Sequence, residues 1–390
     1  MTILKRCAAV INHRSGHRHS VQVYTDTLKQ YMDRAGIVHH DIHIPNDDVA
    51  ESLRRALPHA EALMICGGDG TVNSVVNLMA ALKTTPTRAS SSSSSFPSPL
   101  SQSALDETPL LLVPTGLHNS VATSLGVGAA MRAVSSLVVG RTVRVPLWAV
   151  HLHPPSSSTG AASSSFSSSS SPVRYMCSYV AAGTYAAMVQ RQEKWKEAQE
   201  DYVSFPALLG SVVATSLYTV AEHASPHCTA ALTTSSAESR SEPPSFSLGP
   251  LRLLVAAQMP QLGVGYSLTP TATYHQHRLT VTAATDDVTR LRMCHLLRRE
   301  AREGYILSED GVTTHEGVRG LRIEFPHVSE EGVGWTSSAD IRRVGSKRGN
   351  LDKESEASAL LVLDGECVRV PHGSSLTVTP TELTVQFIVS

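Results

Sequence analysis

The chain alternates short apolar runs with segments in which apolar residues recur at helical spacing. Residues 7–12 (CAAVIN) form an apolar run that predicts a strand, and residues 20–36 have helical spacing that ends at Gly36. The same pattern predicts further strands at 39–44, 62–66 and 109–114, and further helices at 47–58 and 71–82. Repeated strand–helix units predict a parallel sheet with helices on its faces, as in a Rossmann-like α/β domain.

The pattern changes at about residue 142. Strand-like runs then dominate, and two helical stretches, roughly 188–221 and 287–303, interrupt them. Such a series predicts a mainly antiparallel sheet. We therefore expect an α/β protein with an N-terminal Rossmann-like domain, residues 1–141, and a C-terminal domain with a β-sandwich-like antiparallel fold, residues 142–390.

Two segments are too rich in serine and proline to join either core. Residues 89–104 and 154–172 bury too little apolar surface to offset their ordering entropy, so we expect both to be disordered surface inserts.

Composition narrows the class of protein. The net charge is -1, which gives no basic surface for nucleic acid, and the six cysteines contain no Cys-x-x-Cys pair. The N-terminus has no secretion-signal pattern, so we expect a cytoplasmic protein. The apolar run at 205–221 is short and contains glycine, serine and threonine, and is therefore expected to be a buried helix rather than a membrane span.

The most informative stretch is CGGDGT, residues 66–71, at the carboxyl end of an expected strand and before an expected helix. Ligands of open α/β sheets bind at this edge, and glycines allow phosphate oxygens to approach backbone amides at a helix N-terminus. A tight turn without a ligand would use similar residues. The strand–turn–helix setting favours a phosphate site.

GGDGT, residues 67–71, resembles the nucleotide-binding motif of the diacylglycerol-kinase-like lipid kinases. Three further stretches resemble that family in the right order: VINHRSG at 10–16, LLVPTGLHNSVATSLGV at 111–127, and LDGE at 363–366. Within the family the sphingosine kinases are the most similar, because residues 179–196 and 257–284 also resemble their segments.

The resemblance implies an ATP-dependent lipid kinase that uses Mg²⁺ and has the nucleotide between its two domains. Asp69 would be the catalytic base, an ordinary carboxylate with a pKa of ~3.9 in a solvent-facing cleft. The nucleotide would be bound by Asn12, Ser15, Gly16, Gly67, Gly68, Gly70, Thr71, Thr115, Gly116, Asn119, Lys196, Asp364, Gly365 and Glu366. Asp364 and Glu366 would also face the metal ion.

The acceptor implied is the hydroxyl of a long-chain lipid, with a sphingoid base favoured and diacylglycerol or ceramide as alternatives. Val189, Leu209 and Val213 would contact the lipid, and peripheral contact with a membrane would follow.

The chain departs from the family pattern at Leu117 and His118, where the family has a hydroxyl residue and glycine. These departures predict weaker handling of the nucleotide. Val189 stands where sphingosine kinases have an aspartate that binds the lipid head group, and Tyr202 stands loosely where they have an arginine. A non-catalytic lipid- or nucleotide-binding protein of the same fold is therefore one rival. An NAD kinase is the other, although the Asn-Glu dipeptide of that branch is missing at Asn119–Ser120.

Overall fold

The computed structural model describes residues 4–16, 19–84, 108–116, 118–155, 173–198, 228–234, 245–297, 310–326 and 358–389. The serine-rich segment 89–104 and the apolar run 205–221 lie outside these ranges, as does the segment 154–172 from residue 156 onward. The expectations for these segments therefore stay predictions.

The N-terminal region is built on a parallel sheet, as the alternation of strands and helices predicts. Its strands are β1 (Arg6–Asn12), β2 (Val38–Ile44), β3 (Ala62–Gly67) and β4 (Leu110–Pro114), in the order β2-β1-β3-β4. β1 is parallel to both β2 and β3, and β3 is parallel to β4. The carboxyl ends of β1, β3 and β4 therefore lie at one edge of the sheet, where their following turns meet.

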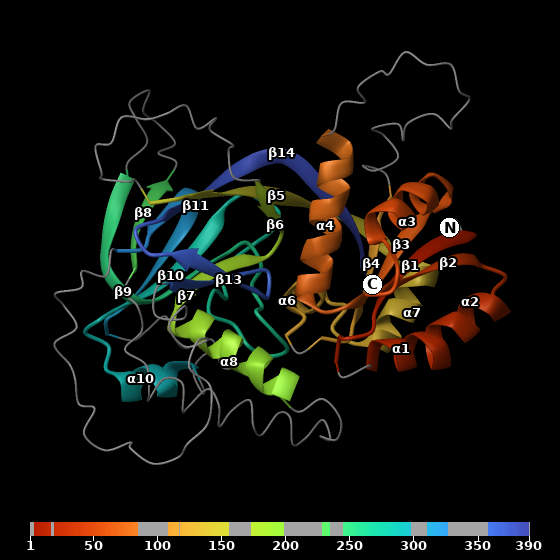
Figure 1. The fold of residues 1–390 in the computed structure, drawn as a ribbon, viewed down its shortest axis with the longest axis horizontal. Coiled ribbons are helices and arrows are strands. Elements are labelled where there is room, and N and C mark those ends of the chain that lie inside the picture. The colour runs from red at the N-terminus through yellow and green to blue at the C-terminus, as the bar shows by residue number, and fades with distance from the viewer. Residues whose placement is uncertain are drawn as a thin grey trace, which may run out of the picture.

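Helices cover both faces of this sheet (Figure 1). α3 and α4 lie on one side, and α1, α2 and α7 lie on the other. The bounds are α1 (His19–Val23), a π-helical segment η1 (Tyr24–Lys29), α2 (Gln30–Arg34), α3 (Val49–Ala56), a 3₁₀ turn η2 (Leu57–His59), α4 (Asp69–Thr84), α6 (Ser120–Ser124) and α7 (Ala130–Val139). The helix expected at 20–36 is thus a continuous helical run from His19 to Arg34 that includes a π segment.

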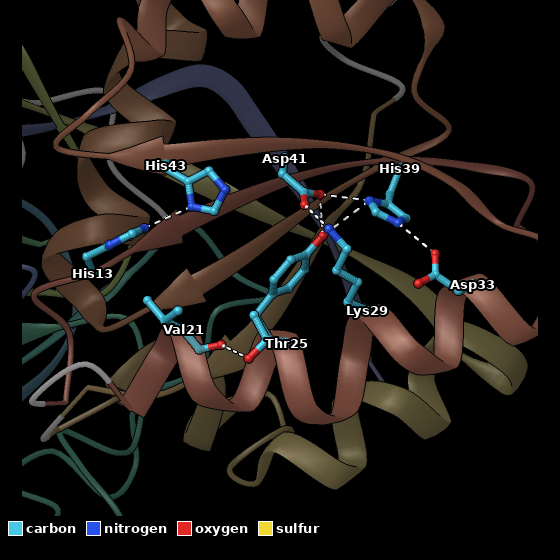
Figure 2. A network of polar contacts seen from close by, with 9 residues as sticks. His13, Val21, Thr25, Lys29, Asp33, His39, Asp41 and His43 are labelled. Atoms are coloured by element: carbon cyan, nitrogen blue, oxygen red, sulfur yellow. Dashed lines mark hydrogen bonds and ion pairs between the residues drawn. The ribbon is translucent and has the colours of Figure 1, made fainter.

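A polar network holds this first helical run on the edge strand β2 (Figure 2). Asp41 accepts hydrogen bonds from the Tyr24 hydroxyl and, at 3.0 Å, from Lys29 Nζ, while its Oδ1 lies 2.8 Å from His39 Nδ1. These hydrogen bonds, with Tyr24 the largest contributor among them, hold the Asp41 pKa below its usual value against the opposing effect of burial. The alternate polar residues of β2 therefore anchor a helix.

The second region consists mainly of antiparallel strands, as expected. They are β6 (Arg174–Met176), β7 (Tyr179–Gly183), β8 (Cys228–Thr234), β9 (Ser245–Ala257), β10 (Leu279–Thr285), β11 (Val312–Glu324), β12 (Ser358–Leu363) and β13 (Glu366–Pro371). β8 pairs with both β9 and β11, and β10 lies between those two strands in the main strand order. The four strands β8, β9, β10 and β11 therefore form a closed ring of strand pairs. Helices α8 (Thr184–Ala198) and α10 (Arg290–His295) accompany these strands.

Two long strands connect the regions. β5 (Arg141–His153) and β14 (Ser375–Val389) pair antiparallel over most of their length. β14 pairs antiparallel with β11 near its start and parallel with β4 near its end, at Phe387 and Ile388. Figure 1 shows both strands running from the second region to the N-terminal sheet. The last residues of the chain thus extend the first sheet, and the boundary expected at residue 141 lies where β5 begins.

The described core has three clusters of buried apolar side chains. One fills the N-terminal region and includes Phe387 from β14. A second lies among the strands of the second region, around Trp148 and Leu254. The third joins α8 and α10 to those strands and includes Val189. The protein is therefore a mixed α/β fold with extensive sheet, and the Rossmann-like and sandwich-like descriptions of its halves stay predictions.

Candidate active site

Two glycine turns lie against each other at the carboxyl edge of the N-terminal sheet. One contains Gly67 and Gly68 between β3 and α4, and the other contains Gly116 between β4 and α6. A Cβ placed on Gly116 would lie only 2.4 Å from Cα of Gly68. The two backbones are therefore so close that glycine is required at the contact.

Asn119 fixes the second of these turns. Its Oδ1 accepts a hydrogen bond from the backbone N of Gly116 at 3.0 Å, and its Nδ2 donates to the carbonyl of the same residue at 2.7 Å. Asn119 adopts a left-handed conformation with φ 51°, which asparagine tolerates better than most residues. Its buried side chain thus supports the backbone of the turn.

The turn after β1 completes the arrangement. Asn12 Nδ2 donates to Thr71 Oγ1 at 2.8 Å, and Thr115 Oγ1 donates to Ser15 Oγ at 3.2 Å. Gly16 has φ +57°, and a Cβ on it would lie 2.1 Å from the carbonyl oxygen of Thr115. The structure therefore brings the residues expected from three separate sequence stretches to one place.

Asp69 lies at the centre of this place and is more buried than expected, with 5% of its surface exposed. Its Oδ2 accepts a hydrogen bond from the backbone N of Ser120 at 2.8 Å, and its Oδ1 accepts one from Val121 at 3.2 Å. Burial raises the pKa of Asp69 to about 6, against the opposing effect of these two amides. The expectation of a solvent-facing carboxylate with an ordinary pKa was wrong, because the start of α6 and the turn at Gly365 cover the side chain.

The turn between β12 and β13 packs directly on Asp69. Gly365 has φ +78°, and a Cβ on it would lie 3.0 Å from Cβ of Asp69. This turn carries the Asp-Gly-Glu stretch, and it meets the Gly-Asp-Gly stretch from almost 300 residues earlier in the chain.

Asp364 holds that turn in place. It is fully buried and adopts a left-handed conformation with φ 45°. Its Oδ1 accepts hydrogen bonds from the backbone N of Ser178 and Tyr179, both at 2.8 Å, and its Oδ2 accepts one from Cys177 at 2.7 Å. Burial raises its pKa, while these amides oppose the shift. With both oxygens occupied, Asp364 is better suited to anchoring the turn than to binding a metal ion.

Two asparagines of α4, which the sequence interpretation missed, connect Asp364 to the N-terminal region. Asn73 Nδ2 lies 2.8 Å from Asp364 Oδ2 and 2.9 Å from the carbonyl oxygen of Tyr175. Asn77 also donates to that carbonyl, at 2.9 Å, and accepts from the backbone N of Tyr175 at 2.8 Å. The available signal was the i, i+4 spacing of two amides within the apolar pattern after GGDGT.

The remaining predicted residues lie at different distances from this centre. Glu366 is partly exposed and forms an ion pair with Arg174, Oε1 to Nη2, at 3.3 Å. Val189 lies on α8 and is buried in the apolar cluster between this helix and the strands. Lys196 lies near the end of the same helix. Leu117, Tyr202, Leu209 and Val213 lie outside the described residues. Within the described part of the chain, no group of three or more His, Cys, Asp or Glu side chains is placed to hold a metal ion.

A family match agrees with this geometry. Residues 6–150 match the family model of the diacylglycerol kinase catalytic domain. The match includes β1, the GGDGT turn and the Asn119 turn, and it spans less than half of the chain. The match shows that this region is similar to that catalytic domain.

The kinase domain match is accompanied by similarity in fold over the whole chain. Two solved structures from Bacillus anthracis str. Sterne, each described as a "putative diacylglycerol kinase", are similar to this chain. One has 13% sequence identity and a TM-score of 0.56, and the other has 12% and 0.54; each alignment covers 100% of this chain and 99% of the other. At such low identity they show a common fold only. No curated protein is similar enough in sequence to be matched.

Proposed function

We propose that this protein is an ATP-dependent kinase that phosphorylates the hydroxyl of a long-chain lipid. The observation that carries the proposal is the position of Asp69, which is buried between the paired glycine turns and the Asp-Gly-Glu turn. A carboxyl group held beside glycine-lined backbone suits the two parts of phosphoryl transfer, namely a base for the hydroxyl and amides for the phosphate.

The glycines provide space for the phosphates. A Cβ on Gly70 would meet no atom within 4 Å, so the backbone at the start of α4 is open on that side. The first amides of a helix have no intrahelical partner and favour an anion. We infer that the amides of Gly68 and Gly70 and the hydroxyl of Thr71 bind phosphate oxygens of ATP, with Asn12 and Ser15 on the side of the first turn.

Asp69 provides the base. Hydrogen bonds from Ser120 and Val121 use one lone pair on each carboxylate oxygen, which leaves acceptor capacity for a substrate hydroxyl. In the transfer, the acceptor oxygen bonds to the γ-phosphorus, the bond from that phosphorus to the bridging oxygen of ADP breaks, and the hydroxyl proton passes to Asp69. A pKa near 6 makes Asp69 a better proton acceptor than an ordinary aspartate and still leaves it mostly ionised at neutral pH.

Kinases of this type use a divalent metal, and Mg²⁺ would neutralise charge on the phosphates. Glu366 is the carboxylate best suited to hold it, because it follows the turn on Asp69 and is not buried. Asp364 would contribute by fixing that turn.

A sphingoid base is the acceptor favoured by the resemblance in the sequence, and diacylglycerol is the alternative. Val189 favours diacylglycerol, because this side chain is buried in an apolar cluster and offers no charge to the ammonium group of a sphingoid base. A lipid acceptor also implies contact with a membrane surface. Within the described chain, no helix is both long enough and apolar enough to cross a membrane.

Transfer of radiolabelled phosphate from ATP to sphingosine, diacylglycerol, ceramide and NAD, each tested separately, examines the proposal directly. We expect one lipid to be phosphorylated and NAD not to be. Binding of ATP without transfer to any lipid would instead favour a non-catalytic protein of the same fold.

A further inference from the structure

His118 departs from the family pattern that the sequence resembles, and its side chain has a defined partner. Its Nε2 lies 2.8 Å from Oε1 of Gln192. Because that amide oxygen only accepts, Nε2 of His118 carries the proton. Gln192 lies on α8, in the second region of the molecule, and is 3% exposed.

The rest of the imidazole is also enclosed. A Cβ on Gly263 would lie 3.6 Å from Nδ1 of His118 and 3.3 Å from its carbonyl oxygen. Burial lowers the pKa of His118, so the ring is neutral at physiological pH. The side chain is thus packed between α8 and the loop after β9.

The backbone that follows His118 is the backbone that holds Asp69. Ser120 and Val121, two and three residues later, donate the amide hydrogen bonds to its carboxylate. Three further contacts fasten the same short segment to the second region. Ser120 Oγ lies 2.8 Å from Ser178 Oγ, Ser124 Oγ donates to the carbonyl of Gln261 at 3.2 Å, and the backbone N of Gln261 donates back to Ser124 Oγ at 3.1 Å.

We propose that His118 is a positioning residue: through Gln192 it couples helix α8 to the turn whose amides fix Asp69. This inference rests on the proposed function and deepens it. α8 also carries Val189, which the sequence resemblance places in contact with the lipid and which is buried in the apolar cluster that joins α8 to the strands. A shift of α8 would therefore reach the base through a hydrogen bond and a short stretch of backbone.

The enzymatic test compares His118→Ala, Gln192→Met and the double variant. Each single change removes one partner of the hydrogen bond, so kcat should fall by about 10- to 100-fold while KM for ATP stays within about twofold. The double variant should be no slower than the slower single variant, because both changes break the same coupling. His118→Gln keeps a donor for Gln192 and should recover most of kcat.

Tyr24→Phe is the matched control. It removes the partly buried contacts of the Tyr24 hydroxyl with Asp41 and His39, in a network on the far edge strand β2. It should lower stability without changing kcat. Additive losses in the double variant, or no rescue by His118→Gln, would overturn the proposed coupling.

Hydrogen exchange separates this inference from the proposed function, since it needs no turnover. The amide protons of Ser120 and Val121 should exchange faster in His118→Ala and in Gln192→Met, while those of β3 should be unchanged. Unchanged exchange at both amides would overturn the coupling even in an active enzyme. Faster exchange in a protein that phosphorylates no lipid would support the coupling and overturn the proposed function.

Discussion

At the scale of single residues, the environment of Asp69 decides the chemistry. Two amides from α6 hold the carboxylate, and burial raises its pKa to about 6. Both effects depend on segments distant in sequence, so a sequence motif can place the aspartate but cannot supply its pKa.

Asp69→Asn keeps the size of the side chain and removes its charge and basicity. We expect kcat for lipid phosphorylation to fall by about 10²–10⁴-fold, the usual contribution of a positioned base, with ATP affinity within a few-fold of wild type. Steady-state kinetics and calorimetric titration with ATP measure the two quantities. A variant as active as the wild type would show that another group is the base, and Glu366 is the next residue to test.

The pH dependence gives a second prediction. Asp69 must be ionised to accept a proton, so kcat/KM should rise as the pH increases through its pKa and level off above it. With a folded-state pKa of about 6, the acidic limb should lie near pH 6 rather than near pH 4. A rate profile between pH 4.5 and 8 measures this limb, and a midpoint near 4 would mean that Asp69 is solvated in the working enzyme.

At the scale of elements, the contact between the two glycine turns is the feature most sensitive to a small change. Gly116→Ala would place a Cβ 2.4 Å from the backbone of Gly68, which cannot rotate away. The turns must separate, and we expect at least a tenfold loss of ATP affinity because phosphate amides would be displaced.

Gly249→Ala in β9 is the matched control for that change, since a Cβ there meets nothing within 4 Å. It should leave ATP affinity unchanged. Titration calorimetry with ATP on both variants measures the difference. Equal affinity in both would show that the turns can separate without affecting the nucleotide.

Local sequence patterns predicted where these elements lie better than they predicted the contacts between the elements. The alternation of apolar and helical segments placed β1 to β4 and their helices within a few residues, because each element has its own periodic signal. The motifs also placed Asp69 and Gly365 in one site. They could not reveal that Asp364 is held by backbone amides, since amides leave no signature in the sequence. The prediction that His118 weakens nucleotide handling could not take its contact with Gln192 into account, because the two residues are 74 positions apart in the sequence.

At the scale of the whole molecule, the sheet passes through both regions. β14 begins in the second region and ends beside β4, with Phe387 opposite Leu110. Asn73, Asn77 and Asp364 connect the same two regions through buried and partly buried hydrogen bonds. The first sheet, at whose carboxyl edge the active site is proposed, therefore extends into the end of β14, which lies beside the first residues of β4.

Phe387→Ala tests this dependence. Phe387 is fully buried and belongs to the core cluster of the N-terminal region, although it lies near the C-terminus. Removing a buried phenyl ring leaves a cavity and typically costs about 3–5 kcal/mol of unfolding free energy. We expect a loss of this size in chemical denaturation and faster amide exchange in β4, whose first residues pair with the end of β14. Thr384→Ala, at an exposed position of the same strand, should change stability by less than about 0.5 kcal/mol. If Phe387→Ala lowered stability while leaving exchange in β4 unchanged, the end of β14 would not be part of the N-terminal core, and the two regions would fold independently.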